Sequence, residues 1–499
     1  METKRVDVLI CGAGGSGMTL GIELARRSIS FLIIEKSPTP FEGSKGKGLT
    51  PRSLEIFDDL GVVDRIYAKG WTDFILRRYS EDGKTFEDLN THEAITPEPS
   101  EPYSTLLLIP QFSTEAILRE RLGELGHRVQ FASELTSFTD SGDSVHCQVQ
   151  TPIGMQAIEA KYLVGCDGGK SFVRKSLGIN FEGDFLDAPP YLAADVEVEG
   201  VTPNVQHRWG TREKHKLFGI GILPHSHLFS IQAALPEQSD KFLDKDVLTQ
   251  LAQERSGNEK IKITRVAWAA TFRFSVRLAE HYRQGRVFIC GDAAHVHPPT
   301  GGQGLNTSLQ DAYNLGWKLA SVLNGGPVTL LDSYESERRT IAKGMLELAT
   351  GIMKKAQLGR GRETHQLDLA YEDSPISFKG SIEKRGVRPG NRAPDAKLRG
   401  AGGRTRQVFD LTKGTHFTLL VNGALVEPEK IERAGLRIFQ IGKQSELQDE
   451  YLEFQKYYGL NDGEAVLIRP DGYIAGVFTN SELTHAETYF TSLGLNSWQ

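Results

Sequence analysis

The glycines near the N-terminus are the first residues whose types and spacing could do chemistry. Gly12, Gly14 and Gly17, with Ser16 between them, follow the apolar run 6–10 and precede a segment with helical spacing. In a strand–turn–helix unit, such glycines allow a tight turn, a close approach of the backbone to a pyrophosphate, and close packing of the helix on the strand. The first turn of the helix then offers N–H groups and a positive dipole end to phosphates. The unit therefore predicts a dinucleotide site.

A second apolar run, 31–34, ends in Glu35, and Lys36 follows it. An acid at the end of this strand, about 20 residues beyond the glycines, is placed to accept hydrogen bonds from a ribose. We assign both residues to the predicted cofactor site. The unit alone does not distinguish FAD from NAD.

A stretch far along the chain discriminates between these two cofactors. The run 287–290 is expected to be a strand that ends in Gly291-Asp292, where the backbone can approach a bound sugar chain and Asp292 can accept its hydroxyl hydrogens. Residues 298–304 then form a loop with little side-chain bulk, and a helix is expected to begin near Leu305. A flat ring system can rest against such a loop, and the helix dipole would stabilise negative charge on a reduced ring. These features predict FAD.

A third stretch, 163–174, again ends an expected strand in an acid and glycines. Asp167 is followed by two glycines, and Arg174 lies on the helix that is expected next. As an isolated pattern, Asp-Gly is more often an ordinary turn. By itself this stretch predicts no site.

Taken together, the three stretches resemble the single-component FAD-dependent aromatic hydroxylases (class A flavoprotein monooxygenases), especially the phenol hydroxylase and aromatic polyketide hydroxylase branches. They are similar to that family's glycine fingerprint, its Asp-Gly motif and its Gly-Asp motif, and the run 301–318 is especially specific. The resemblance covers residues 5–350 well. The remaining residues resemble, more weakly, the thioredoxin-like domain of the longer members, without a Cys-x-x-Cys.

The resemblance implies roles for individual residues. Glu35 would bind the adenosine ribose, Gln111 would contact the cofactor near its ribityl chain, and Asp292 would bind the ribityl–pyrophosphate region. Asp167 and Arg174 belong to a motif that the family associates with both FAD and NAD(P)H. Many members carry an arginine where this chain has Lys45, which keeps the charge but lacks the planar fork. The residues expected to border the isoalloxazine are Pro299, Gly302, Gly304, Leu305 and Asn306.

The resemblance also implies a reaction. NAD(P)H would reduce FAD, O2 would add at the flavin C4a carbon, and the resulting hydroperoxyflavin would transfer its distal oxygen to a phenolic or polycyclic aromatic ring. No second glycine fingerprint follows another strand, so NAD(P)H is expected to dock on the flavin domain. The protein would orient the substrate and exclude water, and no catalytic side chain is predicted. Baeyer–Villiger oxygen insertion or dehydrogenation by the same fold, and more remotely a non-catalytic FAD-stabilised scaffold, are the alternatives.

The middle of the chain, 191–274, shows alternating strands and turns typical of an antiparallel sheet. Trp209, Arg212, Phe218 and His225 are candidate substrate contacts there, although aromatic residues at alternate positions also fit a plain sheet core. Histidine pairs with i, i+2 spacing occur at 225–227 and 295–297, but no carboxylate or thiolate cluster accompanies them. No metal is predicted.

The order of the expected elements predicts an α/β fold, namely a Rossmann-like FAD-binding domain with an inserted antiparallel β-sheet substrate domain and a C-terminal thioredoxin-like α/β domain. The polar, turn-rich stretch 359–395 is interpreted as the boundary before that last domain. The expected boundaries are 1–75, 105–180 and 277–385 for the FAD-binding domain, 76–104 and 181–276 for the substrate domain, and 386–499 for the C-terminal domain.

Bulk properties exclude several classes of partner. The 499-residue chain has a net charge of −6, so no basic footprint for nucleic acid is present. It contains no apolar run of the roughly 20 residues that would span a membrane, and its start does not resemble a signal peptide. Its four cysteines lack Cys-x-x-Cys spacing, which favours a reducing, cytoplasmic location. We expect a small aromatic substrate and O2 as partners, and a homodimer as one candidate assembly.

Overall fold

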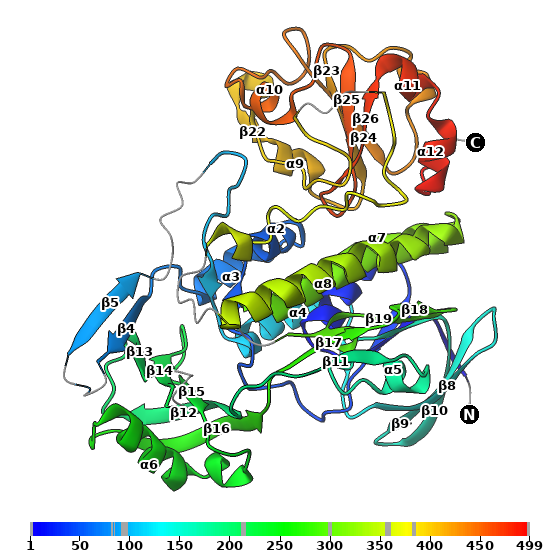
Figure 1. Cartoon of the computed structure of the whole chain (residues 1–499). Coiled ribbons are helices and arrows are strands. Elements are labelled where there is room, and N and C mark those ends of the chain that lie inside the picture. Colours follow the sequence, from blue (N-terminus) through cyan, green and yellow to red (C-terminus); the bar gives the residue numbers. More distant parts are fainter. Residues whose placement is uncertain are drawn as a thin grey trace.

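The computed structural model describes residues 3–80, 83, 85–90, 98–210, 216–297, 302–354, 361–381 and 386–496. The chain forms an α/β fold with mixed sheets. Two long helices, α7 (Gln303–Leu323) and α8 (Asp332–Lys354), cross the middle of the molecule. Figure 1 shows the C-terminal segment above these helices and the other sheets below them.

The glycine loop belongs to a sheet whose central strands run parallel. Its strands are β1 (Lys4–Cys11), β2 (Phe31–Ile34), β7 (Val129–Gln130), β8 (Glu134–Asp140), β9 (Val145–Thr151), β10 (Gly154–Gly165), β18 (Arg283–Gln284) and β19 (Val287–Ile289). The strand order is β18-β19-β10-β1-β2-β7, and β9 and β8 extend the sheet from β10. Because both faces of such a sheet are covered, its strands are apolar runs. Val8, Leu9 and Ile10 accordingly have no exposed surface.

Helices lie around this sheet, and glycine allows the first of them to pack closely against it and against α7. They are α1 (Gly15–Ala25), α2 (Pro51–Asp59), α3 (Val63–Lys69), α4 (Gln111–Glu124) and α5 (Phe172–Ser176), together with α7 and α8. α1 packs against α4 and α7. A Cβ on Gly17 would lie 2.0 Å from Gly12 O, and one on Gly316 would lie 2.5 Å from Glu23 Cβ. Larger side chains would therefore push α1 away from the strand and from α7.

A second sheet lies to the left of the first in Figure 1 and is mainly antiparallel. Its strands are β4 (Ile75–Tyr79), β5 (Phe86–Asn90), β12 (Tyr191–Glu199), β13 (Val205–Trp209), β14 (Phe218–Ile222), β15 (Phe229–Ala234) and β16 (Lys262–Phe272). The order is β16-β12-β15-β14-β13-β4-β5, with β13 and β4 parallel. β4 and β5 precede the other strands by about 100 residues of chain, so the chain enters this sheet twice. α6 (Lys245–Ser256) packs on one face.

Short strands connect these two sheets. β11 (Phe181–Phe185), β17 (Ser275–Ala279) and β20 (His295–Val296) form one small sheet, and β3 (Gly48–Leu49) pairs with β6 (Leu107–Leu108) in another. β20 begins directly after the Gly-Asp turn, so this small sheet adjoins the predicted cofactor loop.

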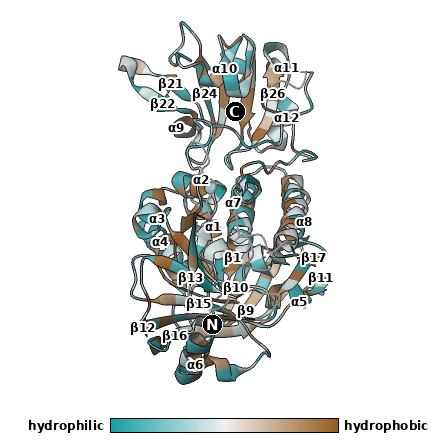
Figure 2. Cartoon of the chain, turned by 60° about the vertical axis from the view of Figure 1, so that its left-hand side comes forward, coloured by the Kyte–Doolittle hydropathy of each residue, from teal (hydrophilic) through white to brown (hydrophobic). Residues whose placement is uncertain are grey.

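The C-terminal segment forms its own small α/β body. Its elements are β21 (Lys397–Arg399), β22 (Thr405–Gln407), α9 (Val408–Thr412), β23 (Phe417–Asn422), β24 (Leu436–Ile441), α10 (Glu453–Tyr458), β25 (Glu464–Ile468), β26 (Ile474–Thr479), α11 (Asn480–Thr484) and α12 (Glu487–Ser492). The central sheet has the order β24-β23-β25-β26. In the turned view of Figure 2 this body lies above α2, α7 and α8.

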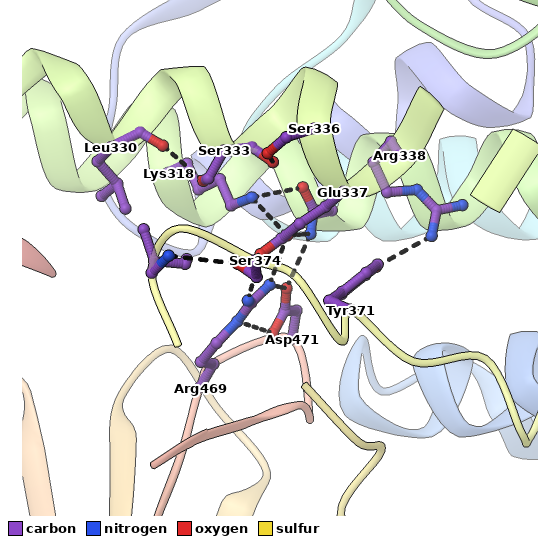
Figure 3. Close-up of polar contacts among 12 residues, drawn as sticks. Lys318, Leu330, Ser333, Ser336, Glu337, Arg338, Tyr371, Ser374, Arg469 and Asp471 are labelled. Carbon is purple, nitrogen blue, oxygen red and sulfur yellow. Dashed lines mark hydrogen bonds and ion pairs between the residues drawn. The ribbon is translucent and has the colours of Figure 1, made fainter. Parts of the chain in front are cut away.

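A buried polar junction joins the C-terminal body to α7 and α8 (Figure 3). Arg469, at the end of β25, forms an ion pair with Glu337 of α8 at 2.6 Å, and Lys318 of α7 pairs with the same carboxylate at 2.7 Å. Asp471 accepts a hydrogen bond from Trp317 Nε1 at 3.0 Å. All five side chains are at most 2% exposed. The junction therefore contains paired charges that water does not reach.

The stretch 359–395, interpreted from the sequence as a boundary segment, contains described residues that are more deeply packed than that interpretation implies. Gln366 is buried; its Nε2 donates to Gln303 Oε1 at 2.7 Å, and its Oε1 accepts from Gln310 Nε2 at 2.6 Å. His365 O accepts from the Arg52 backbone N–H. Polar side chains can be buried in this way because each finds a hydrogen-bond partner.

Candidate functional site: a cofactor groove at the carboxyl edge of the parallel sheet

Stretches distant in the sequence meet where the parallel strands end. Cys166 N donates to Cys11 O at 2.7 Å, and Cys290 N donates to Gly165 O at 2.9 Å. A Cβ on Gly291 would lie only 2.5 Å from Ser16 Oγ. The glycine loop and the Gly-Asp turn therefore lie side by side, and we call the region at this edge of the sheet the cofactor groove.

The glycine loop has the shape that a phosphate site needs. Gly12 has φ of +108°, and a Cβ there would lie 2.2 Å from Cys166 O. By contrast, a Cβ on Gly14 would meet nothing closer than Glu115 Oε1 at 3.9 Å, so the surface of Gly14 is open. No side chain caps the start of α1, and its first N–H groups are available to an anion.

Glu35, at the end of β2, forms a hydrogen bond with the backbone of this loop. Its Oε2 accepts the Ala13 N–H at 3.0 Å, and its Oε1 accepts the Ser37 N–H at 2.9 Å. Lys36 next to it is exposed. The predicted ribose-binding carboxylate thus lies beside the glycine loop, and its position is held by backbone groups.

Lys45 and Gln111 form a second wall of the groove. A Cβ on Gly46 would lie 3.3 Å from Leu305 Cδ2, and Gly46 N donates to Gln111 Oε1 at 3.2 Å. Lys45 Nζ lies 5.2 Å from the centre of the Phe41 ring. The loop that carries Lys45 therefore contacts both α4 and the start of α7.

Asp292 has the position expected of a carboxylate that meets a ligand. Its side chain is solvent-accessible, yet enough protein surrounds it that burial raises its pKa, an effect partly offset by His295 and Lys45. Its nearest protein hydrogen bond, from Ser308 Oγ, is long at 3.4 Å. A hydroxyl-bearing ligand would be able to donate hydrogen bonds to this accessible carboxylate.

The start of α7 presents backbone to the groove. Gly302 precedes it with φ of +70°, and no side chain caps the helix. Leu305 Cδ1 lies 3.1 Å from where a Gly15 Cβ would be, and His297 Cδ2 lies 3.8 Å from a Gly304 Cβ. Pro299 lies outside the described residues.

Asn306 has a positioning role that the sequence did not reveal. Its Oδ1 accepts the Thr50 N–H, and its Nδ2 donates to Gly48 O and Gly302 O, at distances from 2.6 to 2.9 Å. The side chain is buried and its amide is engaged with backbone. Asn306 therefore ties the loop after β3 to the glycine turn rather than presenting its amide to a ring.

Asp167 and Arg174 bind the protein's own backbone. Asp167 Oδ2 accepts the N–H groups of Phe172 and Val173 at the start of α5. Arg174 donates to Ala293 O at 2.7 Å and to Gly169 O at 3.1 Å. Arg174 thus fastens the Asp-Gly motif to the Gly-Asp motif.

A buried chain of hydrogen bonds lies behind the Gly-Asp turn. Asp311 of α7 accepts from His295 Nε2 at 2.6 Å and from Arg338 Nε at 2.8 Å, and His297 Nε2 lies 3.1 Å from His295 Nδ1. Burial opposes ionisation of Asp311, but His295 and Arg338 outweigh it and lower its pKa. Burial also lowers the pKa of His297 to about 3. In the described residues no group of His, Cys, Asp and Glu could hold a metal ion. His295 and His297 instead belong to the hydrogen-bond chain behind the Gly-Asp turn.

The face of the second sheet that points away from α6 lies against the cofactor loops. Asp195 of β12 accepts from Ser44 N at 2.6 Å and from Ser44 Oγ at 2.7 Å, and Lys47 contacts Ser230 of β15. A Cβ on Gly43 would touch Trp268 of β16. Loop 41–47 therefore joins the cofactor groove to this sheet face.

Two of the predicted substrate contacts lie on the opposite face. Trp209 and Phe218 belong to the buried core between the sheet and α6 and are 7% and 0% exposed. Strand alternation directs both side chains into this core, away from the face that loop 41–47 contacts, and their contact with substrate stays a prediction. Arg212 lies outside the described residues. His225 is exposed at the turn after β14, with φ of +51° and its ring 6.5 Å from that of Trp71.

The groove fits FAD. It combines an open glycine backbone, uncapped helix starts on α1 and α7, and an accessible carboxylate at Asp292. Sequence reasoning missed Glu115, Ser44 and Asp195 as parts of this region. The i, i+4 spacing of Gln111 and Glu115 on a helix could have indicated the first, whereas no local pattern indicates the other two. No helix among the described residues has the length and apolarity to cross a bilayer.

Comparisons with known proteins agree with this geometry. A family model described as FAD binding domain matches residues 5–349, and one described as aromatic-ring hydroxylase, C-terminal, matches residues 387–492. A flavin-dependent monooxygenase of Mycobacteroides abscessus is 37% identical over 97% of this chain and 99% of its own. A 12-dehydrotetracycline 5-monooxygenase/anhydrotetracycline 6-monooxygenase of Streptomyces rimosus is 34% identical over 68% of each chain.

Solved structures show the same architecture. The ternary complex of aklavinone-11 hydroxylase with FAD and aklavinone superposes with a TM-score of 0.84 at 25% identity, covering 99% of this chain and 100% of that one. The open glycine loop, the Gly-Asp turn and the start of α7 thus lie in a fold that binds FAD in a relative. The chain belongs to the FAD-dependent aromatic-ring hydroxylases and is a flavin-dependent monooxygenase.

Proposed function

We propose that this monooxygenase uses NAD(P)H and O2 to hydroxylate a phenolic or polycyclic aromatic compound. When bound, FAD supplies electron transfer from NAD(P)H and the activation of O2. Relatives whose names include anhydrotetracycline and aklavinone support a fused-ring substrate. The observation that carries the proposal is a flat row of residues on the sheet face beside the cofactor groove.

This row crosses the strands directly. Ala270, Ala193, Gln232, Gly219 and Arg208 are register partners from β16 through β13, and all five are half-buried. Ala270, Ala193 and Gly219 have little or no side chain, so a planar ring can lie against them. Gln232, between Ala193 and Gly219, and Arg208, at the end of the row, provide polar groups for oxygen substituents.

The next row along the strands closes the site. It contains Trp268, Asp195 and Ser230, the side chains that loop 41–47 contacts. A substrate on the small residues would therefore lie beside the loop that carries Lys45, with protein on both sides. This arrangement supports the tasks of orienting the ring and excluding water.

The proposed cofactor contacts follow from the groove. Glycine loop 12–17 and the start of α1 bind the pyrophosphate, Glu35 the ribose, and Asp292 the ribityl region. Lys45 and Gln111 line the opposite wall, and the start of α7 borders the ring.

The corresponding organisation is a Rossmann-like FAD-binding domain with an inserted substrate domain, 76–104 and 181–276, and a thioredoxin-like domain from 386. The return of β4 and β5 to the second sheet and the separate family match from 387 support it.

A direct assay tests the proposal. Purified protein with FAD is expected to oxidise NADPH faster when a suitable phenol or fused-ring aromatic compound is present. The product should gain one oxygen atom by mass spectrometry, and NMR should place it as a ring hydroxyl. A product that loses two hydrogens would indicate dehydrogenation, and a ring-expanded ester would indicate Baeyer–Villiger insertion. Failure to stimulate NADPH oxidation across a broad panel of phenols and fused-ring compounds would contradict the proposal.

A further inference from the structure

Glu115 is a carboxyl group in the wall of the cofactor groove to which no role has been assigned. It lies on α4, one turn after Gln111, and is 3% exposed. A Cβ placed on Gly14 would lie 3.9 Å from Glu115 Oε1. The carboxyl group therefore lies beside the open part of the glycine loop, where an anionic pyrophosphate is expected to bind.

The hydrogen bonds around Glu115 hold its carboxyl group in place. Gln111 Nε2 donates to Glu115 Oε1 at 2.8 Å. The orientation of the Gln111 amide is set by backbone, because its Oε1 accepts the Gly46 N–H at 3.2 Å. Glu115 Oε1 is thus an acceptor, and the carboxyl group is held in one orientation beside the glycine loop.

The charged groups around Glu115 do not outweigh the effect of its burial. The charged groups that face it are Arg119 of α4, Lys45 of the loop before β3 and Glu35 at the end of β2. α1 contributes the backbone of Gly14 and Gly15, and Arg65 of α3 pairs with Glu124 farther along α4. Burial outweighs the two cations and raises the pKa of Glu115 to about 7.

We propose that Glu115 is a cofactor-positioning residue that is protonated when FAD is bound and donates a hydrogen bond from its carboxyl group to the anionic part of FAD at the glycine loop. An ionised Glu115 would instead place a negative charge beside the diphosphate. A buried neutral acid offers a donor at a place where a lysine or arginine would need more room. The inference rests on FAD binding and not on the identity of the aromatic substrate.

The direction of the pH dependence follows from linkage. FAD favours the protonated form of Glu115. When Glu115 is ionised in the protein without FAD, binding of FAD is therefore accompanied by uptake of one proton. Below pH 7 the site is already protonated and the affinity is constant. Above pH 7 the dissociation constant should rise, by up to tenfold per pH unit, until the pKa of the bound state is reached.

The experiment measures FAD retention by the holoenzyme without substrate. Holoenzyme is diluted at pH values from 6.5 to 8.5, and free FAD is quantified by fluorescence after ultrafiltration. For the native chain we expect the dissociation constant to rise about tenfold or more over this range. Glu115→Gln keeps the acceptor for Gln111 and carries a permanent donor, so it should match the native affinity at pH 6.5 and vary less with pH. Glu115→Ala should bind more weakly at every pH.

Controls separate Glu115 from the other titrating groups. Asp292 also has a raised pKa, but it is unchanged in Glu115→Gln, so any pH dependence that it causes persists in that variant. Glu120→Gln, at an exposed position of the same helix, should behave as the native chain does. An equal pH dependence in the native chain and Glu115→Gln, or native affinity in Glu115→Ala, would overturn the proposal. So would a weaker Glu115→Gln at pH 6.5, because it would indicate that an ionised carboxylate binds FAD. None of these results depends on hydroxylation activity.

Discussion

At the scale of single residues, the accessible carboxylate of Asp292 contrasts with the engaged side chains around it. Asn306 and Arg174 already use their polar groups to hold backbone together. Asp292 has one long hydrogen bond from Ser308. The residues of the site thus divide into those that build the groove and those that face it, and sequence motifs do not separate the two classes.

Replacing Asp292 tests this division. Asp292→Ala should weaken FAD binding by about tenfold to a hundredfold, because hydrogen bonds to a charged group contribute about 1.5–3 kcal/mol. The melting temperature of the chain without FAD should change little, since the side chain is accessible and weakly bonded. FAD titration and thermal denaturation measure the two effects. A large loss of stability without FAD would show instead that Asp292 is structural, and Asp246→Ala at an exposed position of α6 is the control.

At the scale of elements, strand alternation decides which side chains of the second sheet meet substrate. Trp209 and Phe218 point into the core with α6, whereas Gly219, the residue after Phe218, lies on the face toward the cofactor loops. The prediction of an antiparallel sheet in this part of the chain agrees with the structure, and two of the predicted contacts, Trp209 and Phe218, lie on the face that α6 covers. Side chains alternate between the two faces of a strand, so the sequence pattern separates the residues into two faces. It does not tell which of the two faces a helix covers.

Filling the small-residue row tests the element that carries the proposed function. Gly219 has extended backbone, and a Cβ there would meet only backbone oxygens at 3.5 and 3.8 Å, so Gly219→Val should fold. Its side chain would occupy the place proposed for the ring. We expect KM for the aromatic substrate to rise about tenfold, equivalent to about 1.4 kcal/mol.

Steady-state kinetics measure KM, and NADPH oxidation without substrate should be unchanged. Gly123→Val, at an exposed position of α4 where a Cβ meets nothing within 4 Å, is the matched control. An unaltered KM in Gly219→Val would place the substrate elsewhere.

At the scale of the whole molecule, the polar junction couples the C-terminal body to the helix that begins at the cofactor loop. Arg469 and Asp471 contact Glu337 of α8 and Trp317 of α7. Burial opposes ionisation of Glu337, but Arg469 and Lys318 outweigh it and hold its pKa well below the usual range. This contribution to stability is fully present above the unfolded pKa of a glutamate and is lost as the pH falls below it.

Breaking the junction should destabilise the chain. Glu337→Gln removes the negative charge that Lys318 and Arg469 share. It should lower the free energy of unfolding by about 3–5 kcal/mol. Adding Lys318→Met removes one of those charges and should recover part of the loss. Urea denaturation measures the free energies, and FAD release along the same transition reports whether α7 shifts. Glu427→Gln, in an exposed pair with Lys430, should change stability by at most about 1 kcal/mol. Equal effects of Glu337→Gln and Glu427→Gln would contradict the coupling.

Much of the cofactor site could be inferred from the sequence because its signals are local. Gly12 and Gly17 are needed for steric reasons that act within one strand–turn–helix unit, and the start of α7 at Gln303 is close to the expected position near Leu305. A resemblance in three such stretches sufficed to predict FAD and a monooxygenase. The family matches agree with that prediction.

Other features depended on contacts between segments far apart in the chain. The pairing of Ser44 with Asp195 and the burial of Gln366 have no local signature. The position of Glu115 beside Gly14 and the burial of Lys318 also arise only when helices pack. The sequence by itself determined where backbone must come close, since steric constraints are local. Only the tertiary structure decided which faces, charges and loops meet, because burial and electrostatic pairing are properties of the assembled fold.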